Sequence, residues 1–101
     1  MSYAVRLHAN AQRDFARAIA WYAAEAPTEV PRFVDDFIAT ARRLEVFPHL
    51  APLVYRGARR ANLTTYPYQL WYRALDQANV IEVIALLHHR QDPAQFGERL
   101  S

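Results

Sequence analysis

Residues 66–90 constrain the fold more than any other part of this sequence. An aromatic run, Tyr68–Leu75, and an apolar run, Val80–His88, flank the short polar break Asp76–Asn79. Such a pattern predicts a β-hairpin. The second run leads directly into His88-His89-Arg90, so the hairpin delivers imidazole and guanidinium groups to one rim of a sheet. Because the unperturbed pKa of histidine lies near neutrality, this rim is a candidate place for chemistry or recognition.

Strand alternation predicts which side chains of the hairpin are buried. One face of the first strand carries Tyr68, Leu70 and Tyr72, and the other carries Gln69, Trp71 and Arg73. We expect Leu70 and Tyr72 in the core beneath helices, with Gln69 and Arg73 facing the other way. The second strand is apolar on both faces apart from Glu82, which predicts a central position in the sheet.

Two helical segments come earlier in the chain. Apolar residues recur at helical spacing in two stretches that end near Glu25 and Phe47. Asn10 and Thr28 stand where N-caps belong. The break at Pro27 is only two or three residues long, and helices joined in that way form an antiparallel hairpin. Its apolar stripes must be buried against the strands that follow.

Shorter segments complete the order. Residues Tyr3–His8 predict a half-buried strand, residues 49–57 a loop, and Ala58–Leu63 a further strand. A chain of 101 residues is large enough for one core. The sequence therefore predicts a single domain over residues 1–101 with an α+β fold of order β-α-α-β-β-β. In this fold the helix hairpin packs on a small, mainly antiparallel sheet.

The composition excludes several kinds of chemistry. The chain has no cysteine, which removes disulfides, thiolate nucleophiles and cysteine-ligated zinc. Two glycines cannot build a glycine-rich phosphate loop. His88 and His89 are neighbours on a strand, so their side chains point to opposite faces and cannot share one ion. We expect no metal and no cofactor.

The apolar runs and the charge also bear on location and partners. No apolar run approaches the roughly 20 residues of a membrane span, and no secretory signal is visible, so we expect a cytoplasmic protein. The formal net charge is +2, and all 12 cationic residues are arginine. Arginine suits phosphate and carboxylate recognition, although a GC-rich genome, also indicated by the many alanines, explains this choice better. Nucleic-acid contact would need a local patch.

The second half of the chain gathers candidate groups for phosphodiester chemistry or phosphate recognition. Cleavage of RNA through its 2′-hydroxyl needs a base, an acid and cations that stabilise charge on phosphorus. The residues that could supply them are Arg56, Arg59, Arg60, Arg73, Arg90, His88, His89 and Glu82. The candidates for target binding are Arg59, Arg60, Arg73, His88, His89 and Arg90. The alternative is structural: Arg59 or Arg60 is a sheet-face residue paired with Glu82, and one histidine is buried at a strand end.

Aromatic residues suggest a different use of the surface. Trp21, Tyr22 and Trp71, the last with Arg73 nearby, would make good protein-interface anchors if they are exposed. The alternative is that Trp71 packs under the two helices. The sequence leaves both readings open.

Several short motifs in a fixed order make the chain resemble a known family. They are Ala11-x-x-Asp14-Phe15, the break Ala26-Pro27, Leu44-x-x-x-Pro48, Gly57-x-Arg59-Arg60, Tyr66-Pro67-Tyr68-x-Leu70-x-Tyr72-Arg73 and Leu87-His88-x-Arg90-x-Asp92-Pro93. With these motifs, nearly the full length resembles the RelE/ParE superfamily of toxins from type II toxin–antitoxin modules. The resemblance implies the β-α-α-β-β-β fold, growth arrest of the cell, and a cognate antitoxin. That antitoxin would be encoded beside the toxin, carry an N-terminal DNA-binding segment and form a hetero-oligomer with it.

The resemblance leaves the target open between two branches. RelE-like members are ribosome-dependent messenger-RNA endonucleases, and ParE-like members inhibit DNA gyrase. The Tyr-Pro-Tyr strand and the His-x-Arg-x-Asp-Pro end look like the ParE branch and its plasmid-stabilisation relatives, and the lysines common on RelE-like catalytic surfaces are absent. We therefore expect a gyrase inhibitor. The alternatives are a RelE-like nuclease, an inactive member that only binds antitoxin, and an unrelated interaction domain.

Each branch assigns different roles to the candidate residues. In a nuclease, the resemblance would make His88 or His89 catalytic together with Arg59 or Arg60. Glu45 would join them as a base if the second helix ends near that rim. In a gyrase inhibitor, the same rim would serve only as a contact surface. For antitoxin binding, the candidates are Trp21, Tyr22, Trp71 and Arg73.

Overall fold

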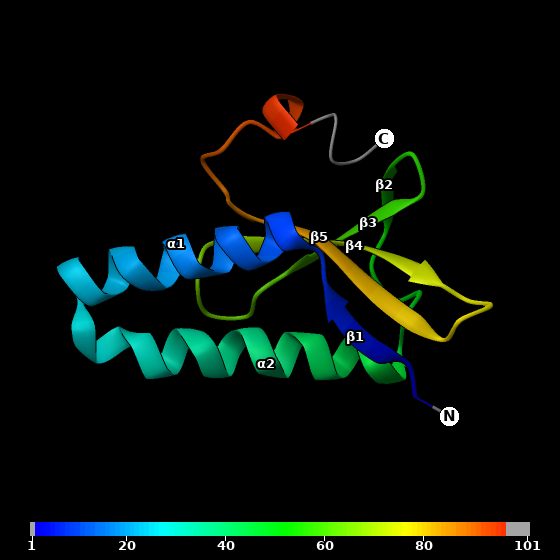
Figure 1. Cartoon of the computed structure of the whole chain (residues 1–101), viewed down its shortest axis with the longest axis horizontal. Helices are drawn as coiled ribbons and strands as arrows, with labels where there is room; N and C mark the ends of the chain where they lie inside the picture. The colour runs from blue at the N-terminus through cyan, green and yellow to red at the C-terminus, as the bar shows by residue number, and fades with distance from the viewer. Residues whose placement is uncertain (1, 97–101) are drawn as a thin grey trace.

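The computed structural model describes residues 2–96 and has the expected α+β architecture, with one strand more than the sequence predicted. Figure 1 shows two helices side by side next to a sheet. The elements are β1 (Ala4–Leu7), α1 (Ala9–Glu25), the 3₁₀ helix η1 (Pro27–Glu29), α2 (Val30–Val46), β2 (Leu53–Tyr55), β3 (Ala58–Asn62), β4 (Tyr68–Leu75), β5 (Val80–His88) and the 3₁₀ helix η2 (Pro93–Phe96).

The sheet is mixed and has the strand order β1-β5-β4-β3-β2. Strand β1 runs parallel to β5, and the other neighbours are antiparallel, as a mainly antiparallel sheet requires. Strand β5 has a neighbour on each side, which confirms its predicted interior position. Strand β2 was predicted as part of a loop. Its three residues are all exposed and lack alternation, so the sequence carries no strand pattern there.

The helix starts differ from the predicted caps. His8, rather than Asn10, caps α1: the His8 Nδ1 atom accepts the Asn10 N–H at 3.2 Å. Thr28 lies within η1, and Glu29 precedes α2 without a side-chain cap. A 3₁₀ turn that leads straight into α2 already pairs backbone groups at this end, which leaves the threonine without a capping position.

The main core lies between the helix hairpin and one face of the sheet. Leu70 and Tyr72 are both 0% exposed, and their cluster includes Tyr22, Phe33 and Phe37 from the helices. The predicted alternation of β4 is therefore confirmed. Aromatic rings dominate this core, as with Tyr22 and Phe33, whose centroids lie 5.1 Å apart.

The opposite face of the sheet carries a second, smaller apolar cluster around Trp71. This side chain is buried with Ala58, Ile84 and Leu87 instead of packing under the helices. The Arg60 guanidinium lies over its ring, 5.8 Å from the centroid. Within the part of the chain that the structure describes, its buried indole N–H has no hydrogen-bond partner.

Two buried aspartates hold the helices to the strands. The Asp36 carboxylate accepts the backbone N–H groups of residues 64, 65 and 66 at 3.1, 2.9 and 3.0 Å, which fixes the β3–β4 turn to α2. The Asp14 carboxylate accepts the Leu86 N–H at 3.1 Å, at a point where β5 has passed the end of β1. These bonds satisfy buried polar groups that would otherwise be costly.

Candidate functional site

The predicted histidines lie at one end of the β4–β5 hairpin, which we call the histidine rim: His88, His89 and Arg90. Its backbone is tightly bonded. The His88 Nδ1 atom accepts the Arg90 N–H at 3.0 Å, and the His88 N–H donates to Gln91 Oε1 at 2.7 Å. The His89 N–H donates to the Pro67 carbonyl at 2.9 Å. The rim is therefore a hydrogen-bonded turn.

The environment of His88 favours its neutral form. Burial, followed by the positive charge of Arg90 and then that of His89, lowers the pKa of His88 below its ordinary value. Because Nδ1 accepts a backbone N–H, the ring proton of the neutral form is assigned to Nε2. This tautomer has no vacant ring nitrogen, so it cannot act as a general base while the turn bond is kept.

The two candidate arginines of β3 point to opposite faces. Arg59 pairs in register with Tyr72, and Arg60 pairs with Trp71, whose side chains lie on different sides of the sheet. Arg59 Nη1 donates to the carbonyls of Ala51 at 2.7 Å and His49 at 3.2 Å, so it ties down the α2–β2 segment.

The other charged candidates have separate partners. Glu82 forms an ion pair with Arg6 at 3.0 Å, instead of with Arg59 or Arg60 as the sequence suggested. Arg73 Nη2 donates to the carbonyl of Arg56 at 3.2 Å. The arginines proposed for one surface are therefore distributed over several contacts.

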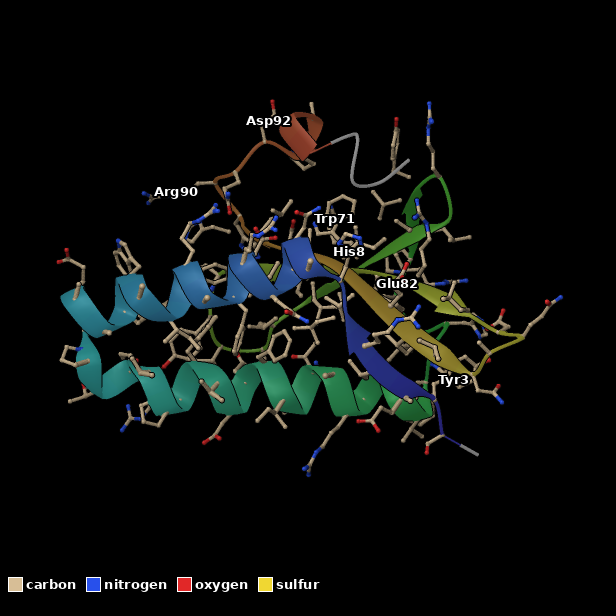
Figure 2. The ribbon with its side chains drawn as sticks, viewed as in Figure 1. Tyr3, His8, Trp71, Glu82, Arg90 and Asp92 are labelled. Atoms are coloured by element: carbon tan, nitrogen blue, oxygen red, sulfur yellow. The ribbon has the colours of Figure 1, made fainter. Side chains whose placement is uncertain are left out.

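Glu45 lies at the far end of β5 from the histidine rim. Its carbonyl accepts the Tyr3 N–H at 2.8 Å, and Ala4 is in register with Val80, where β5 begins. His88 closes this strand of nine residues. At about 3.3 Å per residue, the two ends are roughly 25 Å apart. Figure 2 shows Tyr3 and Arg90 on different sides of the molecule. The structure does not bring Glu45 to the histidine rim.

At that far end the fold assembles a group of side chains that sequence reasoning missed, the Tyr3–Asp76–His49 cluster. Asp76 Oδ1 accepts the Tyr3 hydroxyl and the His49 Nε2–H, each at 2.8 Å. The side chains of His49 and Asp76 are 50% and 58% exposed, so solvent reaches both. The bond from Tyr3, and more weakly that from His49, lowers the pKa of Asp76. Tyr3 is separated from Asp76 by 73 positions, and no local motif marks such a pair.

The aromatic candidates for protein binding divide by burial. Trp21 is 57% exposed and borders a hollow of about 200 Å³ that Arg17, Tyr68 and Gln91 also line. Tyr22 and Trp71 are buried, at 8% and 2% exposure. Of the three, only Trp21 offers its ring to a partner in this conformation.

Among residues 2–96, no group of three or more histidine, aspartate or glutamate side chains could hold a metal ion. Neither described α-helix is long and apolar enough to cross a membrane.

Comparison with known proteins places the chain in a family. Residues 5–93 match the sequence model of the family described as "ParE toxin of type II toxin-antitoxin system, parDE". The chain therefore belongs to the ParE toxin family of type II toxin–antitoxin systems. It is similar to Toxin ParE2 of Mycobacterium tuberculosis, with 27% identity over 102 residues that cover 100% of this chain and 95% of the relative.

Solved structures with the same fold come from both branches of the superfamily. A chain of the chromosomal ParDE system from P. aeruginosa superposes with a TM-score of 0.72 and 18% identity, covering 86% of this chain and 96% of the other. The toxin–antitoxin complex RelBE2 from Mycobacterium tuberculosis gives 0.60 and 21%, covering 87% and 99%. Isolated E. coli RelE gives 0.56 and 14%, covering 96% and 95%. The shared fold therefore does not select a target.

Proposed function

We propose that this ParE-family toxin arrests growth by inhibiting DNA gyrase and is neutralised by a cognate antitoxin. The family match supports the toxin class, and ParE2 is the name of the similar M. tuberculosis protein. Structural relatives described as toxin–antitoxin complexes support the partner. The choice of gyrase rests on the arrangement of this chain's own residues.

The observation that carries this choice is the bonding of the histidine rim. Nuclease chemistry would need a base, an acid and a cation close together. His88 is held neutral with Nδ1 bonded to a backbone N–H, Arg59 and Arg60 point apart, and Glu45 lies at the other end of β5. A rim without converging acid–base groups is better suited to surface contact, which a gyrase inhibitor requires.

A second candidate function, RNA cleavage, is favoured by one other observation. The Tyr3–Asp76–His49 cluster joins a hydroxyl, a carboxylate and an imidazole, and the positive charge of Arg59 acts on Asp76. An aspartate that accepts the His49 Nε2–H leaves Nδ1 to serve as a base. The cluster is exposed, so it could meet a polymeric substrate.

The two functions are separated by testing purified protein in two assays. We expect inhibition of gyrase supercoiling and no cleavage of messenger RNA on translating ribosomes. His88→Gln/His89→Gln should weaken inhibition modestly, whereas changing Arg60, Arg73 and Arg90 together to glutamine should weaken it more. Codon-phased cleavage with unchanged supercoiling would reverse the choice. If His49→Gln abolishes cleavage and the His88/His89 variant still cleaves, the nuclease activity belongs to the Tyr3–Asp76–His49 cluster.

The toxin class has its own test in cells. Expression of the chain alone should arrest bacterial growth, and co-expression of the adjacent short reading frame should relieve the arrest. Immunoblotting of the soluble fraction controls for expression. Normal growth of the source organism at confirmed soluble expression would contradict an active toxin, and arrest without relief would contradict the assigned antitoxin.

A further inference from the structure

One continuous segment, from the end of α2 through β2, exposes most of the large apolar side chains that lie open to solvent. We call it the 46–55 surface: Val46, Phe47, Leu50, Leu53, Val54 and Tyr55, with exposed fractions between 41% and 69%. Only Trp21 and Ile38 are comparably exposed large apolar side chains among the described residues. A concentration of this kind on a small domain indicates a surface that is covered in use.

The charge around the 46–55 surface is positive on balance. Residues 42–60 contain five arginines against the carboxylate of Glu45, and the Asp76 carboxylate bonds to His49 in the same segment. The Arg56 guanidinium lies over the Tyr55 ring, 5.3 Å from its centroid. Arg43 and Arg60 line a cavity of about 230 Å³ beside Leu50. A partner that covers the apolar side chains would therefore be matched by carboxylates at its edges.

The outer edge of β3, beside this cavity, is only partly covered by β2. The register of β2 with β3 includes only Leu53 with Arg59 and Tyr55 with Ala58. The Arg60 N–H donates to the Pro52 carbonyl at 3.3 Å, and past this bond no described strand lies on the outer edge of β3. Asn62, at the end of that edge, lines the same cavity. Open edge groups next to an apolar surface suit an extended chain segment.

Charge and side-chain type decide between the possible occupants. A second copy of this chain paired through β2 would bring Arg56, Arg59 and Arg60 of both copies together, which like-charge repulsion opposes. A single-stranded nucleic acid would require stacking on several aromatic rings, whereas four of the six exposed side chains, Val46, Leu50, Leu53 and Val54, are aliphatic. An apolar, acidic peptide satisfies both the aliphatic side chains and the arginines.

We propose that the 46–55 surface, with Arg43, Arg56 and Arg60 at its edges, binds an extended, apolar and acidic segment of the cognate antitoxin. This inference rests on the proposed toxin function for the identity of the partner. The main antitoxin contact is then formed by the C-terminal end of α2 and by β2. It does not include Trp21, the residue that the sequence suggested for antitoxin binding. The hydrophobic contact supplies most of the affinity, and the arginines make binding weaken as salt is raised.

The test measures affinity for the purified product of the adjacent short reading frame, and for overlapping synthetic peptides of it, by calorimetry. Leu53→Glu/Tyr55→Glu places two negative charges on the surface at exposed positions, where folding should be unaffected. The matched control is Trp21→Glu/Ile38→Glu, which makes the same change at exposed apolar positions elsewhere. Circular dichroism and thermal unfolding establish that both variants are folded. Growth arrest and gyrase inhibition are measured in parallel.

We expect the surface variant to bind the antitoxin about tenfold or more weakly, the control to bind within about twofold of the wild type, and an acidic, apolar peptide to compete. Equal binding by both variants, or a larger loss in the control, would overturn the proposal. The proposal would also be overturned if light scattering showed a wild-type dimer that the surface variant abolishes. That result would assign the surface to a second copy of the chain. Lost gyrase inhibition with normal antitoxin binding would assign it to the target. Failure of gyrase inhibition in the wild type would refute the proposed function and leave the antitoxin measurement valid.

Discussion

The two ends of the β4–β5 hairpin gather polar side chains in different ways. The histidine rim consists of three consecutive residues, and the His88 imidazole accepts the backbone N–H of Arg90 in its own turn. The Tyr3–Asp76–His49 cluster comes from three distant segments, and its side chains bond to one another. Groups that are adjacent in sequence are readily used to close a local turn. Groups that topology brings together are free to make the side-chain network that chemistry or a pH response needs.

The electrostatic settings of the two ends differ accordingly. At the rim, burial and two positively charged neighbours lower the pKa of His88, so the neutral form is favoured. In the cluster, two hydrogen-bond donors lower the pKa of Asp76, so the charged form is favoured. The same direction of shift therefore has opposite consequences for charge, because one group is a cationic acid and the other a neutral acid.

The largest expected effect tests whether both ends depend on one core. Leu70 is fully buried in β4, between the two ends. Leu70→Ala should reduce the free energy of unfolding by about 2–5 kcal/mol, through lost apolar burial and the cavity that remains. Urea unfolding followed by circular dichroism measures this value. A loss below about half a kcal/mol, or a transition in which one end unfolds before the other, would contradict a shared core.

A substitution at Asp36 should disturb the histidine rim and leave the Tyr3–Asp76–His49 cluster unchanged. Its carboxylate holds the turn at residues 64–66, and the neighbouring Pro67 carbonyl accepts the His89 N–H. Asp36→Ala should cost about 2 kcal/mol, because backbone donors lose their acceptor. Amide hydrogen exchange should accelerate in this turn and at His89 and stay unchanged at Tyr3. The exposed neighbour Asp35→Ala is the control, with a change within about 0.5 kcal/mol. If amide exchange accelerated equally at His89 and Tyr3, the two ends would not be independent.

Local patterns predicted the architecture because they report on burial directly. The alternation in β4 correctly placed Leu70 and Tyr72 in the core, and helical spacing predicted both helices. Strand β2 escaped prediction because its three exposed residues have no buried face to create a pattern. The same alternation grouped Trp71 with Gln69 and Arg73, but the sequence left open whether its ring is exposed or packs under the helices. Its burial depended on neighbours such as Ala58 and Ile84, which only the register brings together.

The candidate site was harder to predict than the fold. The sequence drew attention to the histidine rim because its residues are consecutive. It added Glu45 to them on the condition that the second helix ends near the rim. The parallel pairing of β1 with β5 puts Tyr3, and with it the end of α2, at the opposite end. His49 lies in a segment read only as a loop. A contact such as Tyr3 with Asp76 arises from strand order, which no spacing in the sequence encodes.

A smaller effect concerns the acid response of the rim. Because the pKa of His88 is lowered on folding from its ordinary value of 6.5, the unfolded chain takes up a proton first as the pH falls. Stability should therefore decrease below about pH 6.5 and level off below the folded pKa, and His88→Gln should remove this component. NMR titration should give His88 a midpoint below 6.5. Arg90→Gln should raise it part of the way. A midpoint at or above 6.5 would contradict the buried, neutral assignment.

The smallest expected effect belongs to the exposed cluster and appears at lower pH. The folded pKa of Asp76 lies below its ordinary value of 3.8, chiefly because of the Tyr3 hydroxyl. Its contribution to stability should thus be complete above the unfolded pKa and disappear as the pH falls through the folded one. Asp76→Asn should remove this acid-dependent component while leaving the His88 response intact, and Tyr3→Phe should shift the Asp76 midpoint upward. Carboxyl-detected NMR titration and unfolding curves between pH 2 and 7 measure both. If Asp76→Asn also altered the His88 midpoint, the two ends would be coupled through β4 and β5, and their independence would be refuted.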